Sequence, residues 1–67
     1  MTMYTLRDIE IGDYVKNREG ETWKVLAIYN RGNAAHQLML EGEIYPMLLS
    51  EMLKCGYSFG HRGSEHT

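Results

Sequence analysis

A short polar turn between two strand-forming runs is the feature that most constrains the fold of this chain. At residues 17–20, asparagine favours the entry of a turn and Gly20 supplies the positive φ that closes a short hairpin. Tyr14 and Val15 precede the turn, and a run rich in β-branched and aromatic residues follows it as far as Asn30. The pattern predicts a β-hairpin and therefore a fold made mainly of antiparallel sheet.

The expected second strand shows an abrupt change in its apolar pattern. Trp23 and Val25 alternate with polar residues, whereas residues 25–29 are all apolar. Such a change is typical of a strand that bends sharply or is covered on both faces, and long bent second strands are a feature of small barrels. A buried helix is the alternative, and the many poor helix formers in this run disfavour it. A loop at 30–35 then separates this strand from a third.

A second hairpin is predicted around the pair Glu41-Gly42. Apolar arms at 38–40 and 44–45 flank this turn-forming pair. Pro46 cannot donate a hydrogen bond to a neighbouring strand. The fourth strand is therefore expected to lie at the edge of the sheet or to end at this proline.

One short helix is expected before the C-terminus. Ser50 resembles an N-cap, Cys55 lies in the last turn, and Gly56 resembles the left-handed residue that ends a helix. A start at Pro46, a favoured first helical residue, is the alternative. Tyr57 would pack back against the helix and begin a brief closing strand.

The N-terminal segment is predicted to form a capped turn. Thr5 is followed three residues later by Asp8, which is the spacing of a capping box. This turn is expected to deliver both Ile9 and Ile11 to the core before the first strand begins.

The length and the cysteine content limit how the fold can be stabilised. The 67 residues allow one small domain, and 43% hydrophobic residues are typical of a chain that folds. Cys55 is the only cysteine, so no internal disulfide can form. We expect a single domain over residues 1–60, followed by a disordered polar tail at 61–67.

Charge disfavours a nucleic-acid partner, and hydropathy argues against a membrane, which leaves a protein as the expected partner. Seven basic residues against nine acidic ones give a formal net charge of −2, whereas nucleic-acid-binding proteins usually gather basic residues to neutralise phosphates. No apolar run has the length of a membrane span, and the N-terminus lacks a signal-peptide pattern. A cytoplasmic protein without membrane contact is therefore expected, in keeping with its free cysteine.

The sequence offers no recognisable set of catalytic or metal-binding residues. Its histidines are His36, His61 and His66, and no nucleophile is accompanied by a base and an orienting group. The five-residue spacing of His61 and His66 differs from that of helical zinc motifs, and a structural zinc site needs four ligands. We therefore expect no enzyme, metal or cofactor, with Cys55 a small buried residue and His36 a polar residue at a strand edge.

The aromatic residues are the best candidates for a binding surface, because Tyr and Trp are favoured interface anchors. Trp23 and Tyr57 are expected to fill the barrel, leaving the other tyrosines half-buried. Acidic residues at the two hairpin tips could steer a basic partner surface. The candidate binding residues are Tyr14, Glu19, Glu21, Tyr29, Glu41, Glu43 and Tyr45.

The order of elements over residues 9–59 resembles a Src-homology-3-like small barrel. The first hairpin is similar to that of KOW-type modules, which implies binding to RNA or to the transcription and translation machinery. The chain departs from that pattern because Trp23 and Lys24 stand where a second glycine is usual, and because it is acidic. The residues that carry the similarity are Gly12, Asp13, Val15, Gly20, Val25 and Ile28.

The ending LSEMLKCGYSFG, residues 49–60, resembles the tails of short barrel proteins of bacteriophages and prophages. This resemblance implies a protein that binds and inhibits one host protein. The leading expectation is therefore a non-catalytic protein-interaction module, and the alternative is a KOW-like module that binds nucleic acid or associates with ribosomes or the transcription machinery.

Overall fold

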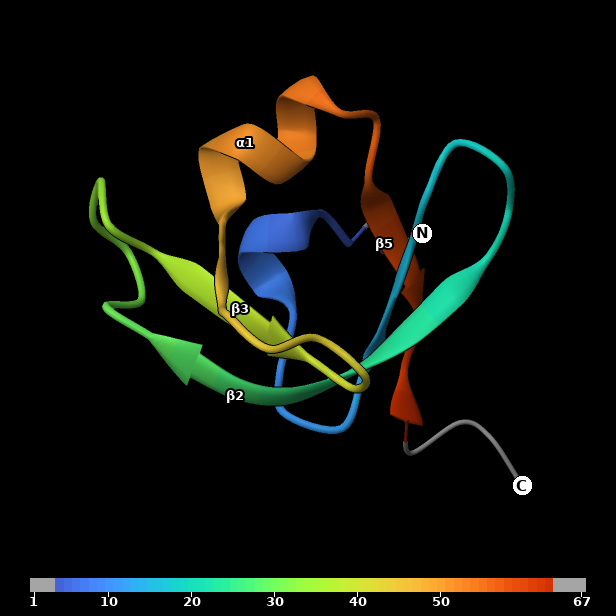
Figure 1. Cartoon of the computed structure of the whole chain (residues 1–67), viewed down its shortest axis with the longest axis horizontal. Helices are drawn as coiled ribbons and strands as arrows, with labels where there is room; N and C mark the ends of the chain where they lie inside the picture. Colours follow the sequence, from blue (N-terminus) through green and yellow to red (C-terminus); the bar gives the residue numbers. More distant parts are fainter. Residues whose placement is uncertain (1–3, 64–67) are drawn as a thin grey trace.

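The computed structural model describes residues 4–63, which form a curled antiparallel half-barrel with one short α-helix near the C-terminus (Figure 1). The five strands lie in the order β4-β3-β2-β1-β5, and every neighbouring pair is antiparallel. The predicted fold class, mainly β with four or five strands and one helix, is confirmed. In chain order the elements are η1 (Leu6–Asp8), β1 (Tyr14–Lys16), β2 (Thr22–Tyr29), β3 (Gln37–Leu40), β4 (Met47–Leu48), α1 (Leu49–Lys54) and β5 (Ser58–His61).

The first hairpin forms where the sequence predicts it. The Asn17 N–H donates to the Glu21 carbonyl oxygen at 2.9 Å, and Gly20 has a φ of +88°. The Asn17 side-chain oxygen accepts hydrogen bonds from the N–H groups of Glu19 and Glu21. The turn is therefore closed by its own side chain as well as by the backbone.

The bend predicted in β2 is confirmed. Its register against β3 shifts after Val25, which faces Leu40, so that Ala27 faces Met39. Leu26 is the extra residue of this bulge and is exposed. The first part of β2 pairs with β1 and the second part with β3, which lets one bent strand serve both halves of the sheet.

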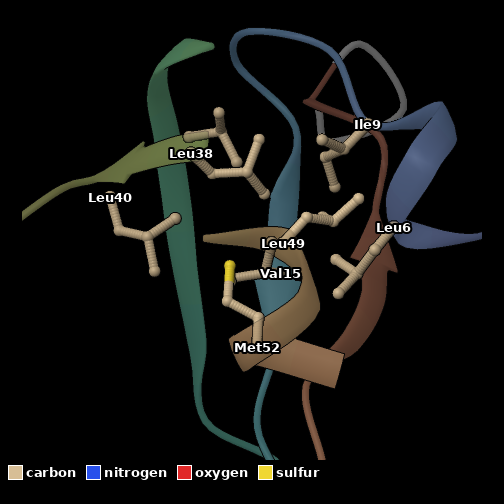
Figure 2. Close-up of a cluster of buried hydrophobic side chains, with 8 residues drawn as sticks. Leu6, Ile9, Val15, Leu38, Leu40, Leu49 and Met52 are labelled. Carbon is tan, nitrogen blue, oxygen red and sulfur yellow. The ribbon is translucent and has the colours of Figure 1, made fainter. Parts of the chain in front are cut away.

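The core lies between the curled sheet and the two helices η1 and α1 (Figure 2). The sheet contributes alternate residues from β1, β2 and β3, while each helix contributes two positions, one of them immediately after η1. Each fully buried aliphatic side chain stabilises the fold by roughly 1.5–3 kcal/mol, which matters in a chain without a disulfide. The buried hydrophobic residues are Leu6, Ile9, Val15, Val25, Leu38, Leu40, Leu49 and Met52.

Trp23 and Tyr57 pack against this core as partly buried rings, with their centroids 6.1 Å apart. They belong to the inner side of the fold, as the sequence predicts. At the N-terminus the Asp8 carboxylate accepts a hydrogen bond from the Thr5 N–H at 2.9 Å, which confirms the capped turn.

The second hairpin is wider than the sequence predicts. The turn at Glu41-Gly42 is present, with the Glu43 N–H bonded to the Leu40 carbonyl oxygen. The expectation that residues 44–45 form a strand is wrong, because β4 begins only after Pro46. Proline has no N–H to offer the ladder, so pairing starts one residue later and leaves the preceding residues in an exposed loop.

The helix begins at neither of the two predicted positions. Leu48 is its N-cap and makes no side-chain cap bond, so Ser50 lies inside the first turn. The Leu49 N–H is bonded to the His36 carbonyl oxygen at 2.8 Å, and this tertiary contact replaces a side-chain cap. Pro46 lies three residues before the helix.

The C-terminal end of the helix follows the prediction. Gly56 has a φ of +89°, and its N–H is bonded to the Leu53 carbonyl oxygen. The Tyr57 N–H reaches the Met52 carbonyl oxygen at 3.0 Å. These two bonds are the pair that defines a Schellman ending.

Three expectations of burial are wrong. Ile11 is 64% exposed because it lies in a tight turn in which the Asp13 N–H is bonded to the Glu10 carbonyl oxygen. Cys55 is exposed, because α1 has only six residues and buries one face. His36 is only 2% exposed, and its ring is hydrogen-bonded to the Gly32 N–H of the loop that precedes β3.

The folded part extends beyond the expected boundary at residue 60. Strand β5 continues through His61, and Arg62 and Gly63 contact Asp13. Residues 61–63 of the predicted disordered tail are therefore ordered, and its remaining residues, 64–67 with His66, lie outside the described residues.

Candidate protein interface

The loop at residues 41–46 is the most exposed apolar feature among the described residues. Ile44 is 82% exposed and its neighbour Tyr45 is 77% exposed. The loop is nevertheless tied to the sheet at both ends: the Glu41 N–H donates to the Lys24 carbonyl oxygen at 2.9 Å, and Met47 pairs with Leu38. Two large apolar side chains are thus held in solvent by an anchored backbone.

Acidic residues flank this apolar tip. Glu41 and Glu43 are exposed, and neither carboxylate has an ion-pair partner among residues 4–63. Their charges are therefore available to a partner. A surface that offers basic groups around an apolar depression would complement the tip.

The predicted binding residues do not gather in one place. Glu41, Glu43 and Tyr45 share the second hairpin loop, while the hairpin tip that carries Glu19 and Glu21 lies away from it at the start of β2 (Figure 1). Glu21 is also engaged in its own turn, where it accepts from the Asn17 amide at 3.0 Å.

Two predicted tyrosines lie on other parts of the sheet. Tyr29 is the last residue of β2 and is 46% exposed, roughly 20 Å along the strand from its start. Tyr14 is half-buried on β1, where it faces Lys24 across the ladder and its ring stacks on His61 with centroids 4.3 Å apart. Only the second hairpin tip therefore combines the predicted aromatic and acidic residues.

A hollow of about 570 Å³ lies beside Tyr14, between the turn at 10–13 and the end of β5. Asp13 and Arg62 are among its lining residues, with a distance of 2.7 Å between the Asp13 Oδ2 and the Arg62 Nη1 atoms. The same carboxylate accepts hydrogen bonds from the N–H groups of Glu10 and Gly63, at 2.9 and 3.0 Å.

Asp13 is only 4% exposed, and its hydrogen-bond partners stabilise the ionised form of its carboxyl group. Burial by itself would raise the pKa of this carboxyl group, but the hydrogen bonds from the Gly63 and Glu10 N–H groups and the Arg62 guanidinium outweigh it. The pKa of Asp13 is therefore below its ordinary value. Asp13 is a structural anion that joins the first turn to the last strand.

Arg62 is held by aromatic rings as well as by the carboxylate. Its guanidinium carbon lies 4.1 Å from the centroid of the Tyr4 ring and 5.3 Å from that of Phe59, and these two rings stack on each other. Contacts of this kind stabilise a cation by roughly 0.5–2 kcal/mol. Because the side chain is engaged on both sides, it is poorly placed to bind a ligand.

His36 forms a second buried polar position. Its Nδ1 atom accepts a hydrogen bond from the Gly32 N–H at 3.3 Å, so in the neutral ring the proton lies on Nε2. That Nε2 atom is buried and has no hydrogen-bond partner among the described residues. Burial, assisted by the nearby charges of Arg31 and Arg7, lowers the pKa of His36.

Residues 4–63 contain no group of three or more histidine, cysteine or acidic side chains placed to hold a metal ion. Within the same range, no helix has the length and apolar character required to cross a membrane. Comparisons with protein families, with curated proteins and with solved structures gave no match. The resemblances to Src-homology-3-like barrels, KOW-type modules and phage proteins therefore rest on the sequence pattern alone.

Sequence reasoning missed the most exposed apolar residue. The apolar pattern places Ile44 in a strand. Its exposure could be predicted from the proline two positions later, because a residue without an N–H delays the start of strand pairing. The exposure of Ile11 could have been suspected from Gly12-Asp13, a pair typical of turns. Leu26 is exposed through the bulge in β2, whose position the apolar pattern indicates only approximately.

Proposed function

We propose that this protein is a non-catalytic protein-interaction module that binds its partner through the loop at residues 41–46. The observation that carries the proposal is the pair Ile44 and Tyr45, adjacent in sequence, about four-fifths exposed, and flanked by Glu41 and Glu43. Large apolar residues are costly to leave in water and are the usual anchors of an interface.

The construction of the loop supports this role. Backbone bonds to β2 and β3 fix its two ends, so little chain entropy is lost when a partner binds. Tyr45 combines a large apolar ring with a hydroxyl group, which suits a position that is wet when free and buried when bound. The charges of Glu41 and Glu43, which form no ion pair within residues 4–63, would accelerate association with a basic surface.

We further propose that the half-barrel is Src-homology-3-like. The order of strands, with a short helix before the last one, supports this reading. The resemblance of residues 49–60 to phage barrel proteins makes a bacterial host protein the first partner to seek, with inhibition or modulation of that protein as the outcome.

Affinity capture from a bacterial lysate, with and without nuclease, tests the proposed function. We expect a protein partner that survives nuclease treatment and is lost with Tyr45→Ala or Ile44→Ser. Tyr29→Ala is the matched control, because Tyr29 is also an exposed tyrosine but lies at the end of β2. Equal loss of the partner in the control variant, or retention in all variants, would contradict the proposed site.

A KOW-like nucleic-acid module is the second candidate. The observation that favours it is a small basic and aromatic grouping, in which Lys24 faces Tyr14 across the ladder and Tyr14 stacks on His61. Titration against mixed single- and double-stranded nucleic acids at about 0.15 M salt separates the two functions. Specific nanomolar binding that falls with Lys24→Glu would replace the protein-binding proposal.

A further inference from the structure

We infer that the partner-binding surface does not end at the loop 41–46 but continues across β2 to the turn at residues 10–13. This inference rests on the proposed function and adds Leu26 and Ile11 to the contact. It also specifies the partner: a protein surface with an apolar strip, a basic group at one end, and an acidic group near its middle.

Backbone hydrogen bonds place the two turns on opposite sides of one short stretch of β2. The Glu41 N–H donates to the Lys24 carbonyl oxygen, and the Gly12 N–H donates to the Val25 carbonyl oxygen at 2.8 Å. Figure 1 shows the blue turn and the yellow loop converging on the middle of this strand. Adjacent strands are separated by about 4.8 Å, so the two turns lie only about 10 Å apart across β2.

Large aliphatic residues are exposed all along this path. Ile11 is 64% exposed, Leu26 is 47% exposed, and Ile44 is 82% exposed. Val25 is fully buried in the core, whereas its neighbour Leu26, the extra residue of the bulge, is exposed to solvent. A single apolar residue on a surface needs no explanation, but several that converge on one stretch of strand indicate an interaction site.

The spacing suits one partner, because a typical stable interface covers about 800 Å² on each side. Such an area spans considerably more than the width of one strand. A partner that covers Tyr45 and Ile44 would therefore reach Leu26 and the Ile11 turn without any change in the backbone.

The sign of the charge changes from one end of this surface to the other. At one end are the carboxylates of Glu41 and Glu43, and beside the middle is the Lys24 ammonium group. None of these three groups has an ion-pair partner among residues 4–63. The carboxylates near the other end are already neutralised, since Glu10 pairs with Arg31 and Asp13 with Arg62. The pattern is acidic, then basic, then neutral, and it would fix the orientation of the partner.

Site-specific photocrosslinking tests how far the surface extends. Benzoylphenylalanine replaces Tyr45, Ile11 or, as a control, Leu53, which is 46% exposed on α1. Each variant is irradiated in a nuclease-treated bacterial lysate, and the crosslinked protein is identified by mass spectrometry. The same protein should be crosslinked from positions 45 and 11 and not from position 53.

The identified protein, once purified, provides a quantitative second arm. We expect Ile11→Ala to raise its Kd at least about fivefold, which corresponds to the 1 kcal/mol that separates contributing from neutral contacts. Leu53→Ala should change the Kd by less than twofold. Thermal melting of both variants confirms that they remain folded.

The outcomes separate this inference from the proposed function. Crosslinking from position 45 alone, or an unchanged Kd for Ile11→Ala, would overturn the extended surface and leave the loop proposal intact. Crosslinking from neither position would overturn both. Crosslinks only to a second copy of this chain, or to a protein without basic groups at its contact, would contradict the partner described above.

Discussion

Replacing Asp13 with alanine should destabilise the fold strongly, although Asp13 lies outside the apolar core. The carboxylate is 4% exposed and accepts from the Glu10 and Gly63 N–H groups as well as from Arg62. Its removal takes this acceptor away from all three donors and leaves the Arg62 guanidinium without its carboxylate partner. A hydrogen bond to a charged group is worth about 1.5–3 kcal/mol, and we expect a loss of about 3 kcal/mol because three donors lose one acceptor while the Arg62 side chain keeps 20% exposure.

This loss is large in relation to the whole fold. A chain of 67 residues has a free energy of unfolding of roughly 3–10 kcal/mol. Asp13→Ala could therefore be largely unfolded at room temperature. Asp13→Asn is the milder variant, because one amide oxygen can still accept while the NH₂ group opposes a donor, with a cost of roughly 1–3 kcal/mol.

Urea unfolding followed by circular dichroism and by Trp23 fluorescence measures the effect. The pKa of Asp13 is lowered in the folded state, so on acidification the unfolded chain takes up the proton first. The stability contributed by this group is present above the ordinary carboxyl pKa and is lost as the pH falls towards its folded value. Asp13→Asn should remove that part of the acid sensitivity.

Asp8→Asn is the matched control for Asp13. The pKa of Asp8 is also lowered, chiefly by hydrogen bonds from Thr5, but its carboxylate is exposed. The control should lose much less stability in neutral solution. A loss of less than about 1 kcal/mol in the free energy of unfolding for Asp13→Ala would refute a buried structural anion. Equal losses for Asp13→Asn and Asp8→Asn would refute it as well.

Three further predictions concern the turn, the thiol and the buried imidazole. Gly20→Val should cost about 1 kcal/mol or more in urea unfolding, because a β-branched residue resists the φ of +88° although the space for a Cβ is open; an unchanged midpoint would contradict this. Cys55 should react with a thiol reagent in the native protein as fast as in urea to within about tenfold, since it is exposed, and strong protection would show that it is covered. The pKa of His36 is lowered by burial, Arg31 and Arg7, so the unfolded chain binds the proton first and stability should fall as the pH drops below about 6.5. His36→Gln should flatten that slope relative to His61→Gln, and equal slopes would refute the assignment.

Local chemistry accounts for the parts of the fold that were predicted correctly. The turn ending at Gly20 and the helix ending at Gly56 depend on positive φ values that few other residues adopt without strain. The bend in β2 was predictable because the alternation of apolar and polar residues cannot continue through a bulge. In each case the cause and its effect lie within a few residues of one another.

The errors arise where distant segments decide the outcome. The helix begins at Leu49 because its N–H is hydrogen-bonded to the His36 carbonyl oxygen, a contact that no local sequence pattern predicts. Likewise, Asp13 and Arg62 are 49 residues apart and come together only when β5 pairs with β1. Ile9 and Ile11 have the same spacing that a strand would show, so hydropathy alone could not distinguish the buried residue from the exposed one.

The candidate surface was predictable only in part for the same reason. The sequence indicated Tyr45 with Glu41 and Glu43, because all three lie in one predicted hairpin, the two acidic residues at its tip and Tyr45 in its second arm. Ile11 could join them only once the hydrogen bonds around β2 were known.

The turn at residues 10–13 links the stability of the fold to the proposed surface. Two hydrogen bonds between Glu10 and Asp13 close it, one from the Asp13 N–H to the Glu10 carbonyl oxygen and one from the Glu10 N–H to the Asp13 carboxylate. Ile11 lies between these bonds and is therefore presented by an ordered backbone, which spares the partner part of the cost of ordering a loop on binding. Asp13→Asn should accordingly weaken partner binding even at temperatures where the variant is still folded, whereas Ile11→Ala should weaken binding without reducing stability. A binding constant for Asp13→Asn equal to that of the unmodified protein would show that the turn, although structural, does not position the contact.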